Sequence, residues 1–179
     1  LQVEPSADGK RRLKMWGPNG SRYETANWEA QLRAMNRKAA AFRAGYQAGG
    51  GERYVRPRVF VNSLSDTFED WQGPVYRLVD GSVQKNQAHI HAQSIEGLRK
   101  RFFQVAEECT ELDLLLLTKR PENVLRMVPL HWLKMDGKWP AWVWIGTTVE
   151  DQEHADKRIP ELLKVPAKVR FLSVEPLLG

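Results

Sequence analysis

The 179-residue sequence holds a single cysteine, Cys109. One thiol cannot form a disulfide within the chain, and it cannot supply the several sulfur ligands of a zinc or iron–sulfur site. Long apolar runs are absent as well, because none reaches the 18 or more residues that a membrane-spanning helix needs, and there is no signal-peptide pattern. These absences predict a protein without a membrane segment that resides in the cytoplasm.

Histidine is scarce too, with four residues, and none of them ends an apolar run. A Ser, His, Asp triad would therefore need a loop that folds back over the site. His89 and His91 lie close together in a polar stretch, but two histidines without a neighbouring carboxylate cluster are weak evidence for a metal site. We expect no metal to be bound by this chain.

What the sequence does contain is four short apolar runs, each of which stops at a group of polar residues. The four stretches are 58–66, 112–122, 142–151 and 169–176, and their apolar parts are rich in Val, Leu, Phe and Trp. Such runs predict strands buried on both faces, as in parallel sheets covered by helices. The carboxyl ends of parallel strands share one edge, where ligands bind in α/β folds. The four polar groups therefore locate a candidate site.

Helical patterns separate these runs. Apolar residues recur at helical spacing over 94–109, and further helices are expected from Pro121 and over 151–158. The polar stretch 69–93 is expected to be a long loop. Alternating strands and helices imply right-handed crossovers and a parallel sheet. Because a closed eight-unit barrel takes about 250 residues, four units predict an α/β fold with half of a β/α barrel.

The N-terminal part is expected to differ from this domain. Residues 1–22 are rich in turn formers and predict an irregular arm, and an apolar stripe over 27–42 predicts a helix that nearby glycines end. We therefore expect a basic arm with its helix over 1–57 and a partial-barrel domain over 58–179. The chain does not begin with methionine and stops just after the fourth run, which predicts a fragment or a processed product.

Positive charge is concentrated in the same N-terminal third. Residues 1–58 hold 12 Lys and Arg against 5 Asp and Glu, whereas residues 59–179 hold 15 against 17. With its aromatic residues, the segment 10–58 could follow a nucleic-acid backbone and stack on bases. The alternative is a solvated basic helix whose aromatics pack on the barrel.

The polar residues after the first run are Asn62, Ser63, Ser65 and Asp66. Alternation along a strand places Ser63 and Ser65 on one face and Asn62 on the other. Two hydroxyls and a carboxylate could hold a ribose, a metal-bound water or an amine. The alternative is that Ser65 or Asp66 only closes a turn or caps the segment that follows.

The second run ends at Thr118, Lys119 and Arg120, directly before a proline. Adjacent cations at a strand end, followed by a helix N-terminus, predict an anion site because free N–H groups add to the side-chain charge. A phosphate or a carboxylate suits this site. The alternative is that the cations form ion pairs with acids at the same edge, such as Glu150 or Glu175.

The third run ends at Thr147, Thr148, Glu150 and Asp151. Thr148 and Asp151 have the spacing of a capping box, in which each side chain satisfies a free N–H at the start of a helix. Glu150 is then the functional candidate, with Thr147 beside it.

The fourth run ends at Ser173 and Glu175, which share one face of the strand. A glutamate that ends a buried strand is costly unless it is paired or takes part in chemistry. Glu175 is thus the first candidate for a catalytic residue.

Several of these segments resemble one protein family. The similar stretches are Trp16 with Gly17, NWEAQLRAMNRKA from Asn27, RPRVFVNSLSDTFEDW from Arg56, LDLLLLTKRPEN from Leu112, VWIGTTVEDQEHADKRIPELL from Val143 and VRFLSVEPLLG from Val169. They span most of the chain and resemble phage and prophage proteins labelled gene products thirty-seven and sixty-eight. The most specific are TKRPEN, VEDQ and SVEPLLG.

The resemblance implies a relative of radical S-adenosylmethionine enzymes with a partial barrel, in the cytoplasm of a bacterial host. Complete members of that family are expected to carry an N-terminal three-cysteine motif for an iron–sulfur cluster and further strands after the PLLG motif. This chain begins downstream of those cysteines and stops about halfway round the barrel. The resemblance therefore implies no cofactor within the chain, but a cluster and S-adenosylmethionine in the full-length protein.

Two functions are compatible with the sequence. In the first, the chain is part of a radical-SAM-like enzyme whose sheet edge binds an anionic or nucleoside-like ligand. The catalytic candidates are then Glu175, Asp66 and Glu150, and the ligand-binding candidates are Asn62, Ser63, Ser65, Thr118, Lys119, Arg120, Thr147 and Ser173. In the second, the chain is a non-enzymatic nucleic-acid-binding or phage accessory module that acts through residues 10–58.

Overall fold

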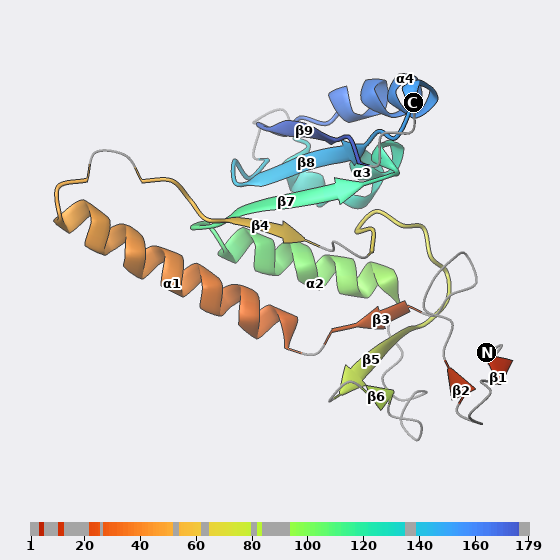
Figure 1. Cartoon of the computed structure of the whole chain (residues 1–179), viewed down its shortest axis with the longest axis horizontal. Helices are drawn as coiled ribbons and strands as arrows, with labels where there is room; N and C mark the ends of the chain where they lie inside the picture. The colour runs from red at the N-terminus through yellow and green to blue at the C-terminus, as the bar shows by residue number, and fades with distance from the viewer. Residues whose placement is uncertain are drawn as a thin grey trace. The chain divides into compact units, whose positions relative to one another are not determined.

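The computed structural model of the chain describes residues 4–5, 11–12, 22–25, 27–51, 54–61, 65–79, 82–83, 94–134 and 139–175 (Figure 1). The chain forms two compact units. One contains Leu1–Trp28 and Trp71–Arg99, and the other contains Glu29–Asp70 and Lys100–Gly179. The division predicted at residues 57 and 58 from charge stays a prediction.

The larger unit is built on a four-stranded sheet. Its strands are β4 (Arg58–Val61), β7 (Asp113–Thr118), β8 (Val143–Thr148) and β9 (Arg170–Ser173), in the spatial order β4-β7-β8-β9. All three neighbouring pairs are parallel. The four apolar runs therefore form the predicted strands, and their carboxyl ends share one edge. Among the described strands β4 and β9 remain outer strands, so the sheet does not close, and the α/β class with a partial barrel-like sheet is confirmed.

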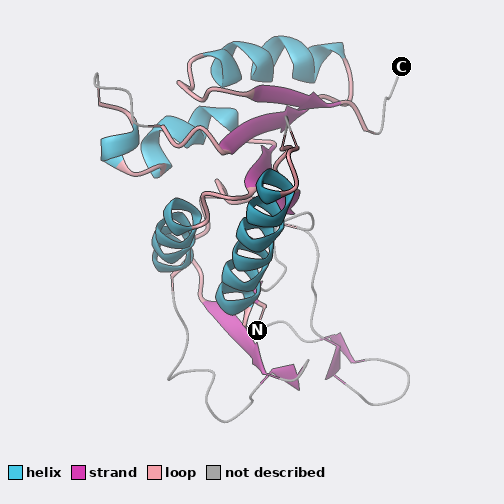
Figure 2. Cartoon of the chain, turned by 90° about the vertical axis from the view of Figure 1, so that its left-hand side faces the viewer, coloured by secondary structure: helices cyan, strands magenta, loops and turns pink. Residues whose placement is uncertain are grey.

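One face of this sheet is fully buried over its two central strands. Leu114 and Leu116 of β7 and Val143 and Ile145 of β8 are each 0% exposed. The register places Leu114 beside Val143 and Leu116 beside Ile145, so the four side chains form one apolar layer. Helix α4 (Gln152–Leu163) contacts β8 (Figure 2). Burial of this layer removes apolar surface from water and stabilises the unit.

The opposite face is apolar but only partly covered; we call it the open face. It carries Phe60, Leu115, Trp144 and Phe171, with Gly146 at its centre. The rings of Phe60 and Phe171 come from the two outer strands, about 14 Å apart at ordinary strand spacing, yet their centroids lie only 6.2 Å apart. A side chain at Gly146 would meet the Phe171 ring at 2.4 Å. The two rings thus close over the middle of this face.

Burial on both faces was expected for all four strands, and this is wrong for the outer two. Phe60 is 49% exposed and Leu172 is 45% exposed. Each outer strand has a neighbour on one side only. Phe60 therefore reaches solvent on the open face, and Leu172 reaches solvent on the opposite face. Only β7 and β8 approach the expected pattern.

Helix α1 (Trp28–Ala48) is longer than the sequence predicts. Gly45 was expected to break it, but one interior glycine costs only about 1 kcal/mol, and the helix continues through it. Gly50, with a φ of 80°, lies two residues beyond the helix, where a left-handed conformation suits glycine. Of the expected stripe, Leu32 and Ala39 are buried.

Helix α2 (Ile95–Glu108) is confirmed and is joined to α1 by ion pairs. The guanidinium of Arg33 lies 2.7 Å from Glu108, and that of Arg101 lies 2.9 Å from Glu29. The Arg33 contact holds the pKa of Glu108 below its usual value. These two contacts fix the N-terminal part of α1 against α2.

The segment after β7 forms short turns rather than one helix. Pro121–Asn123 is a 3-10 turn (η1), followed by the single-turn helix α3 (Val124–Met127) and a second 3-10 turn, η2 (Leu130–Trp132). Pro121 does begin this segment, as its missing N–H predicts. The helix predicted over 151–158 is α4, which extends to Leu163.

The start of α4 differs in detail from the expected capping box. Asp151 is the N-cap, and its carboxylate accepts a 2.8 Å hydrogen bond from the N–H of His154. Thr148 is instead the last residue of β8. Its carbonyl accepts a 2.7 Å bond from Arg158, so its backbone rather than its side chain meets α4.

The smaller unit contains strands that the sequence analysis missed. β3 (Arg22–Glu24) pairs in parallel with β5 (Val75–Val79), which pairs antiparallel with β6 (Ser82–Val83). β1 (Glu4–Pro5) pairs antiparallel with β2 (Arg11–Arg12). The expected long loop at 69–93 and the irregular arm at 1–22 are therefore wrong in part. None of the helices in the described part of the chain is long and apolar enough to cross a membrane.

Candidate functional site at the carboxyl edge of the sheet

Asp66 is the centre of the polar structure at the carboxyl ends of β4 and β7. The hydroxyl of Thr118 lies 2.8 and 3.0 Å from the two carboxylate oxygens of Asp66. The backbone N–H groups of Phe68 and Lys119 also donate to this carboxylate, at 2.9 and 3.1 Å. Asp66 thereby joins the segment after β4 to the end of β7.

Arg120 completes the bonding of Asp66. Its Nη1 lies 3.0 Å from Oδ2 of Asp66, and its Nη2 lies 3.6 Å from Glu69. The side chain of Arg120 is 41% exposed, whereas that of Asp66 is only 13% exposed. The carboxylate is thus covered, while part of the guanidinium faces solvent.

Lys119 and Arg158 hold the second carboxylate of this edge, Glu150. The ammonium of Lys119 pairs with one oxygen of Glu150, and Arg158 contacts the other at 2.6 Å. Glu150 is 7% exposed in all. Its burial acts to raise the pKa of its carboxyl, but the hydrogen bonds from Lys119 and Arg158 outweigh burial and lower that pKa. Glu150 is therefore ionised at neutral pH.

The residues around Asp66 and those around Glu150 form one continuous cluster, which we call the strand-end site. It consists of Asp66, Thr118, Lys119, Arg120, Glu150 and Arg158. Lys119 has three N–H donors, one of which reaches Glu150, and 56% of its side chain is exposed. Lys119 and Arg120 are held on one side by carboxylates and reach solvent on the other, whereas Arg158 is mostly buried. Such a geometry can receive an anionic group.

The structure therefore brings together five of the site residues predicted from the sequence. They are Asp66, Thr118, Lys119, Arg120 and Glu150. The ion pair between Lys119 and Glu150 is the one considered as the alternative to ligand binding. Both interpretations of the cations remain compatible with the structure, because each cation is paired and also exposed.

The other candidates have different surroundings. Thr147 is fully buried, and its hydroxyl donates to the carbonyl of Thr118 at 2.8 Å. Ser173 is half-buried at the end of β9, and Ser65 is exposed. Asn62 and Ser63 lie outside the described residues.

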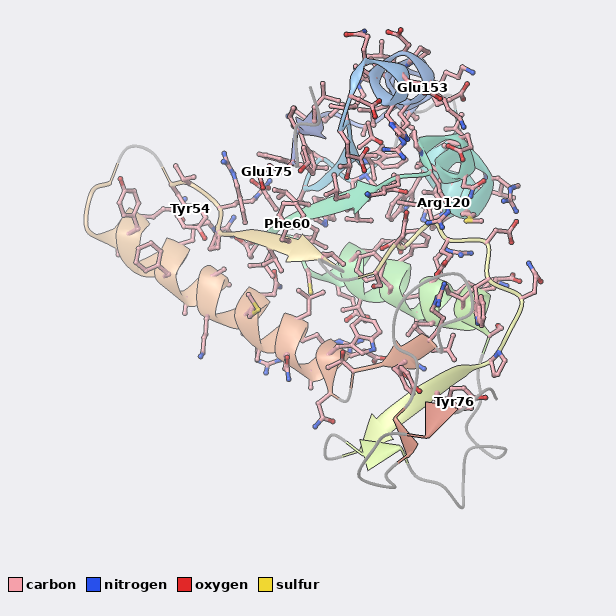
Figure 3. The ribbon with its side chains drawn as sticks, turned by 45° about the vertical axis from the view of Figure 1, so that its right-hand side comes forward. Tyr54, Phe60, Tyr76, Arg120, Glu153 and Glu175 are labelled. Carbon is pink, nitrogen blue, oxygen red and sulfur yellow. The ribbon has the colours of Figure 1, made fainter. Side chains whose placement is uncertain are left out.

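Glu175 lies just beyond β9 and is exposed (Figure 3). Glu175 therefore does not bear the cost of a buried carboxylate. The reason is that β9 is an outer strand, so a residue beyond its end remains in contact with water. As a solvent-accessible carboxylate, Glu175 differs from the paired acids Asp66 and Glu150.

Arg158 is the site residue that sequence reasoning missed. Its side chain is 12% exposed. It lies three residues after Ala155 and four before the buried Leu162, on the stripe of α4 that is expected to be apolar. A charged residue at such a position signals a buried partner, which here is Glu150.

Cys109 does not fit the role of an iron–sulfur ligand. It is fully buried after the end of α2, and burial raises the pKa of its thiol, which opposes the thiolate form that a metal needs. Across the described ranges, no group of three or more His, Cys, Asp or Glu residues could hold a metal ion. A surface hollow lies away from this site, between α1 and α2, where Glu29, Arg33 and Arg101 line it.

The sequence of the chain matches one known protein family over most of its length. The model of a family described as "Protein of unknown function (DUF5131)" matches residues 8–179. The chain belongs to this family. The match covers the four strands of the main sheet and every residue of the strand-end site. No curated protein and no solved structure is significantly similar to the chain. Since the description of DUF5131 assigns no activity, the function has to be argued from the residues themselves.

Proposed function

We propose that this member of DUF5131 binds a small anionic, nucleoside-like ligand at the strand-end site. The observation that carries the proposal is the pair of adjacent cations after β7. Lys119 and Arg120 are 56% and 41% exposed, and each is fixed in place by a carboxylate behind it. A ligand phosphate or carboxylate would use their remaining N–H donors.

Preorganisation is the physical advantage of this arrangement. A lysine or arginine side chain that is mobile in the free protein loses conformational entropy when it binds a ligand. Here Glu150 and Asp66 already restrict Lys119 and Arg120, so part of that entropy is lost on folding rather than on binding. The balance of charge also limits the affinity, because an anion has to compete with these carboxylates. We therefore expect micromolar rather than nanomolar dissociation constants.

The open face supplies a complementary apolar surface. The last residues of the open face on β8 and β9 are Thr148 and Ser173, which are paired in register. The open face therefore ends at the carboxyl edge of the sheet, as the strand-end site does. Its rings, Phe60 and Phe171, are suited to pack against a nucleobase. A nucleoside with an anionic group would thus contact both surfaces.

The resemblance to radical-SAM-like phage proteins leads to a narrower proposal, that the ligand is S-adenosylmethionine in a larger enzyme. Its carboxylate would contact Lys119 and Arg120. Since Cys109 does not fit a cluster ligand, we assign no radical step to residues of this chain. Asp66 and Glu150 are ion-paired and suit positioning, whereas the exposed Glu175 is accessible to solvent and to a ligand.

Isothermal titration calorimetry with S-adenosylmethionine, S-adenosylhomocysteine and adenosine tests the proposal. We expect binding of the first two and weaker binding of adenosine, which lacks the carboxylate. K119Q should weaken binding about 10- to 100-fold, the range for lost hydrogen bonds to charged groups. K157Q, which changes an exposed lysine on α4, is the matched control. Absence of binding, or equal affinity of K119Q and K157Q, would refute the proposal.

A further inference from the structure

Three aromatic side chains meet on the C-terminal half of α1 and the segment that follows it. The centroids of Phe42 and Tyr46 lie 6.4 Å apart, and Tyr54 lies 6.2 Å from Phe42 and 6.5 Å from Tyr46. Figure 3 shows Tyr54 beside the C-terminal end of α1. We call Phe42, Tyr46 and Tyr54 the aromatic patch.

The aromatic patch is exposed to a degree that a purely structural cluster does not require. Phe42 is 66% exposed and Tyr46 is 38% exposed. Met35, which lies two turns before Phe42 on the same side of α1, is 44% exposed. Tyr54 is held by a 3.2 Å hydrogen bond from its hydroxyl to the carbonyl of Ala39. The ring of Tyr54 is therefore held in place, while Phe42 and Tyr46 beside it keep much of their surface in solvent.

The part of α1 that carries Phe42 and Tyr46 has charged side chains of one sign. Between Glu29 and Glu52 the sequence contains four cations and no carboxylate. Two of them, Arg33 and Arg43, pair with acids of the larger unit. The other two, Arg37 and Lys38, are exposed, and Lys38 lies one turn before Phe42 on the same side of the helix.

We propose that the aromatic patch and Lys38 form a binding site for single-stranded nucleic acid. Bases would stack on Phe42 and Tyr46, and the phosphates would contact Lys38. Exposed aromatic rings next to a cation are the pattern by which proteins bind single strands without reading their sequence. After Glu29 in its first turn, α1 carries no further carboxylate, which favours a polyanion over a protein partner, whose surface carries both signs of charge. This site is distinct from the strand-end site and does not depend on it.

Fluorescence anisotropy with a labelled 20-nucleotide oligothymidine tests the proposal on the full chain. We expect binding at 50 mM salt that weakens steeply by 200 mM, because phosphate contacts release counterions. F42A should weaken binding about 5- to 100-fold, the range for loss of one stacked base. K38Q should weaken binding and also reduce its salt dependence. L130A, which removes a side chain 79% exposed on η2, is the apolar control, and K157Q is the charge control.

Two conservative variants separate stacking from a structural role. F42Y keeps a ring and should bind as the unchanged protein does. Y54F keeps its ring but loses the bond to Ala39, so it should lower stability more than affinity. Absence of oligonucleotide binding at 50 mM salt would overturn the proposal, as would equal affinity of folded F42A and L130A. Self-association that F42A abolishes, without any oligonucleotide binding, would assign the patch to a protein interface instead.

Discussion

The carboxylate of Asp66 accepts the hydroxyl of Thr118 at 2.8 Å, although 52 residues separate the two in sequence. The bond connects the segment after β4 with the last residue of β7. Thr118 also accepts a 2.9 Å hydrogen bond from the N–H of Arg120. A single threonine thus fixes both the acid and the cation at the strand-end site.

We expect Asp66→Asn to destabilise the fold by about 1–3 kcal/mol, because Arg120 loses the nearer of its two charged partners and one acceptor becomes a donor. Urea unfolding measures this change. Asp70→Asn is the control, since Asp70 pairs with Arg126 at an exposed position, where a pair contributes about 0–1 kcal/mol. Equal losses in the two variants would contradict a central role for Asp66.

The stability of the protein should depend on the protonation of Glu150. Its pKa in the folded state lies below the unfolded value near 4.5, so its contribution is present above that pH and is lost as pH falls through the folded pKa. Glu150→Gln removes this contribution. Urea unfolding between pH 3 and 7 should therefore show a smaller loss toward acid pH for the variant than for the unchanged protein. Parallel pH profiles would contradict the assignment.

Gly146→Ala should destabilise the sheet by about 1–3 kcal/mol, the usual cost of overpacking. The new methyl group would lie 2.4 Å from the ring of Phe171 and displace it. A double-mutant cycle with Phe171→Ala measures the coupling between the two positions. Gly146→Ala should cost little in the Phe171→Ala background, because the ring is absent there. An unchanged cost in the Phe171→Ala background would show that the clash involves other atoms.

Asp151→Ala should cost about 0.5–2 kcal/mol, because the N–H of His154 at the start of α4 loses its acceptor. Thermal unfolding followed by circular dichroism provides the measurement. Gln152→Ala, at the next and exposed position, should leave stability nearly unchanged. If Thr148→Val, which removes the side-chain hydroxyl, costs as much as Asp151→Ala, the N-cap has been assigned to the wrong residue.

The main sheet could be predicted from sequence because its signal is local. Each apolar run is long enough for one strand, and the helical spacing between runs implies parallel connections. The edge positions of β4 and β9 could not be predicted, since strand order depends on contacts between distant segments. For that reason the expected burial of Phe60 and Leu172 was wrong.

The strands of the smaller unit were missed although the sequence contains a hairpin signal. Asp80 and Gly81 stand between the strand residues Val79 and Ser82. An Asp-Gly dipeptide flanked by strand formers is typical of a two-residue hairpin. The surrounding glycines and prolines are also typical of loops, and they favoured the prediction of one long loop.

At the strand-end site, sequence predicted the residue types and offered Glu150 and Glu175 as possible partners of the cations, but it could not choose between them. Adjacent cations after a strand were recognisable, and so was an acid after a neighbouring strand. That Glu150 takes Lys119 and Arg158 together depends on how α4 lies against β8. Side-chain pairing across 31 residues is a property of the packed structure, and no spacing rule within one element contains it.

The outer strands of the main sheet carry a further consequence for solution behaviour. Among the described strands, none pairs with the free sides of β4 and β9, whose unbonded N–H and C=O groups can template another strand. Both strands begin with an arginine, Arg58 and Arg170. Their like charges repel a second copy that approaches edge to edge, and salt screens this repulsion. Concentrated protein in high salt should therefore polymerise through its edges, whereas dilute protein at low ionic strength stays dispersed.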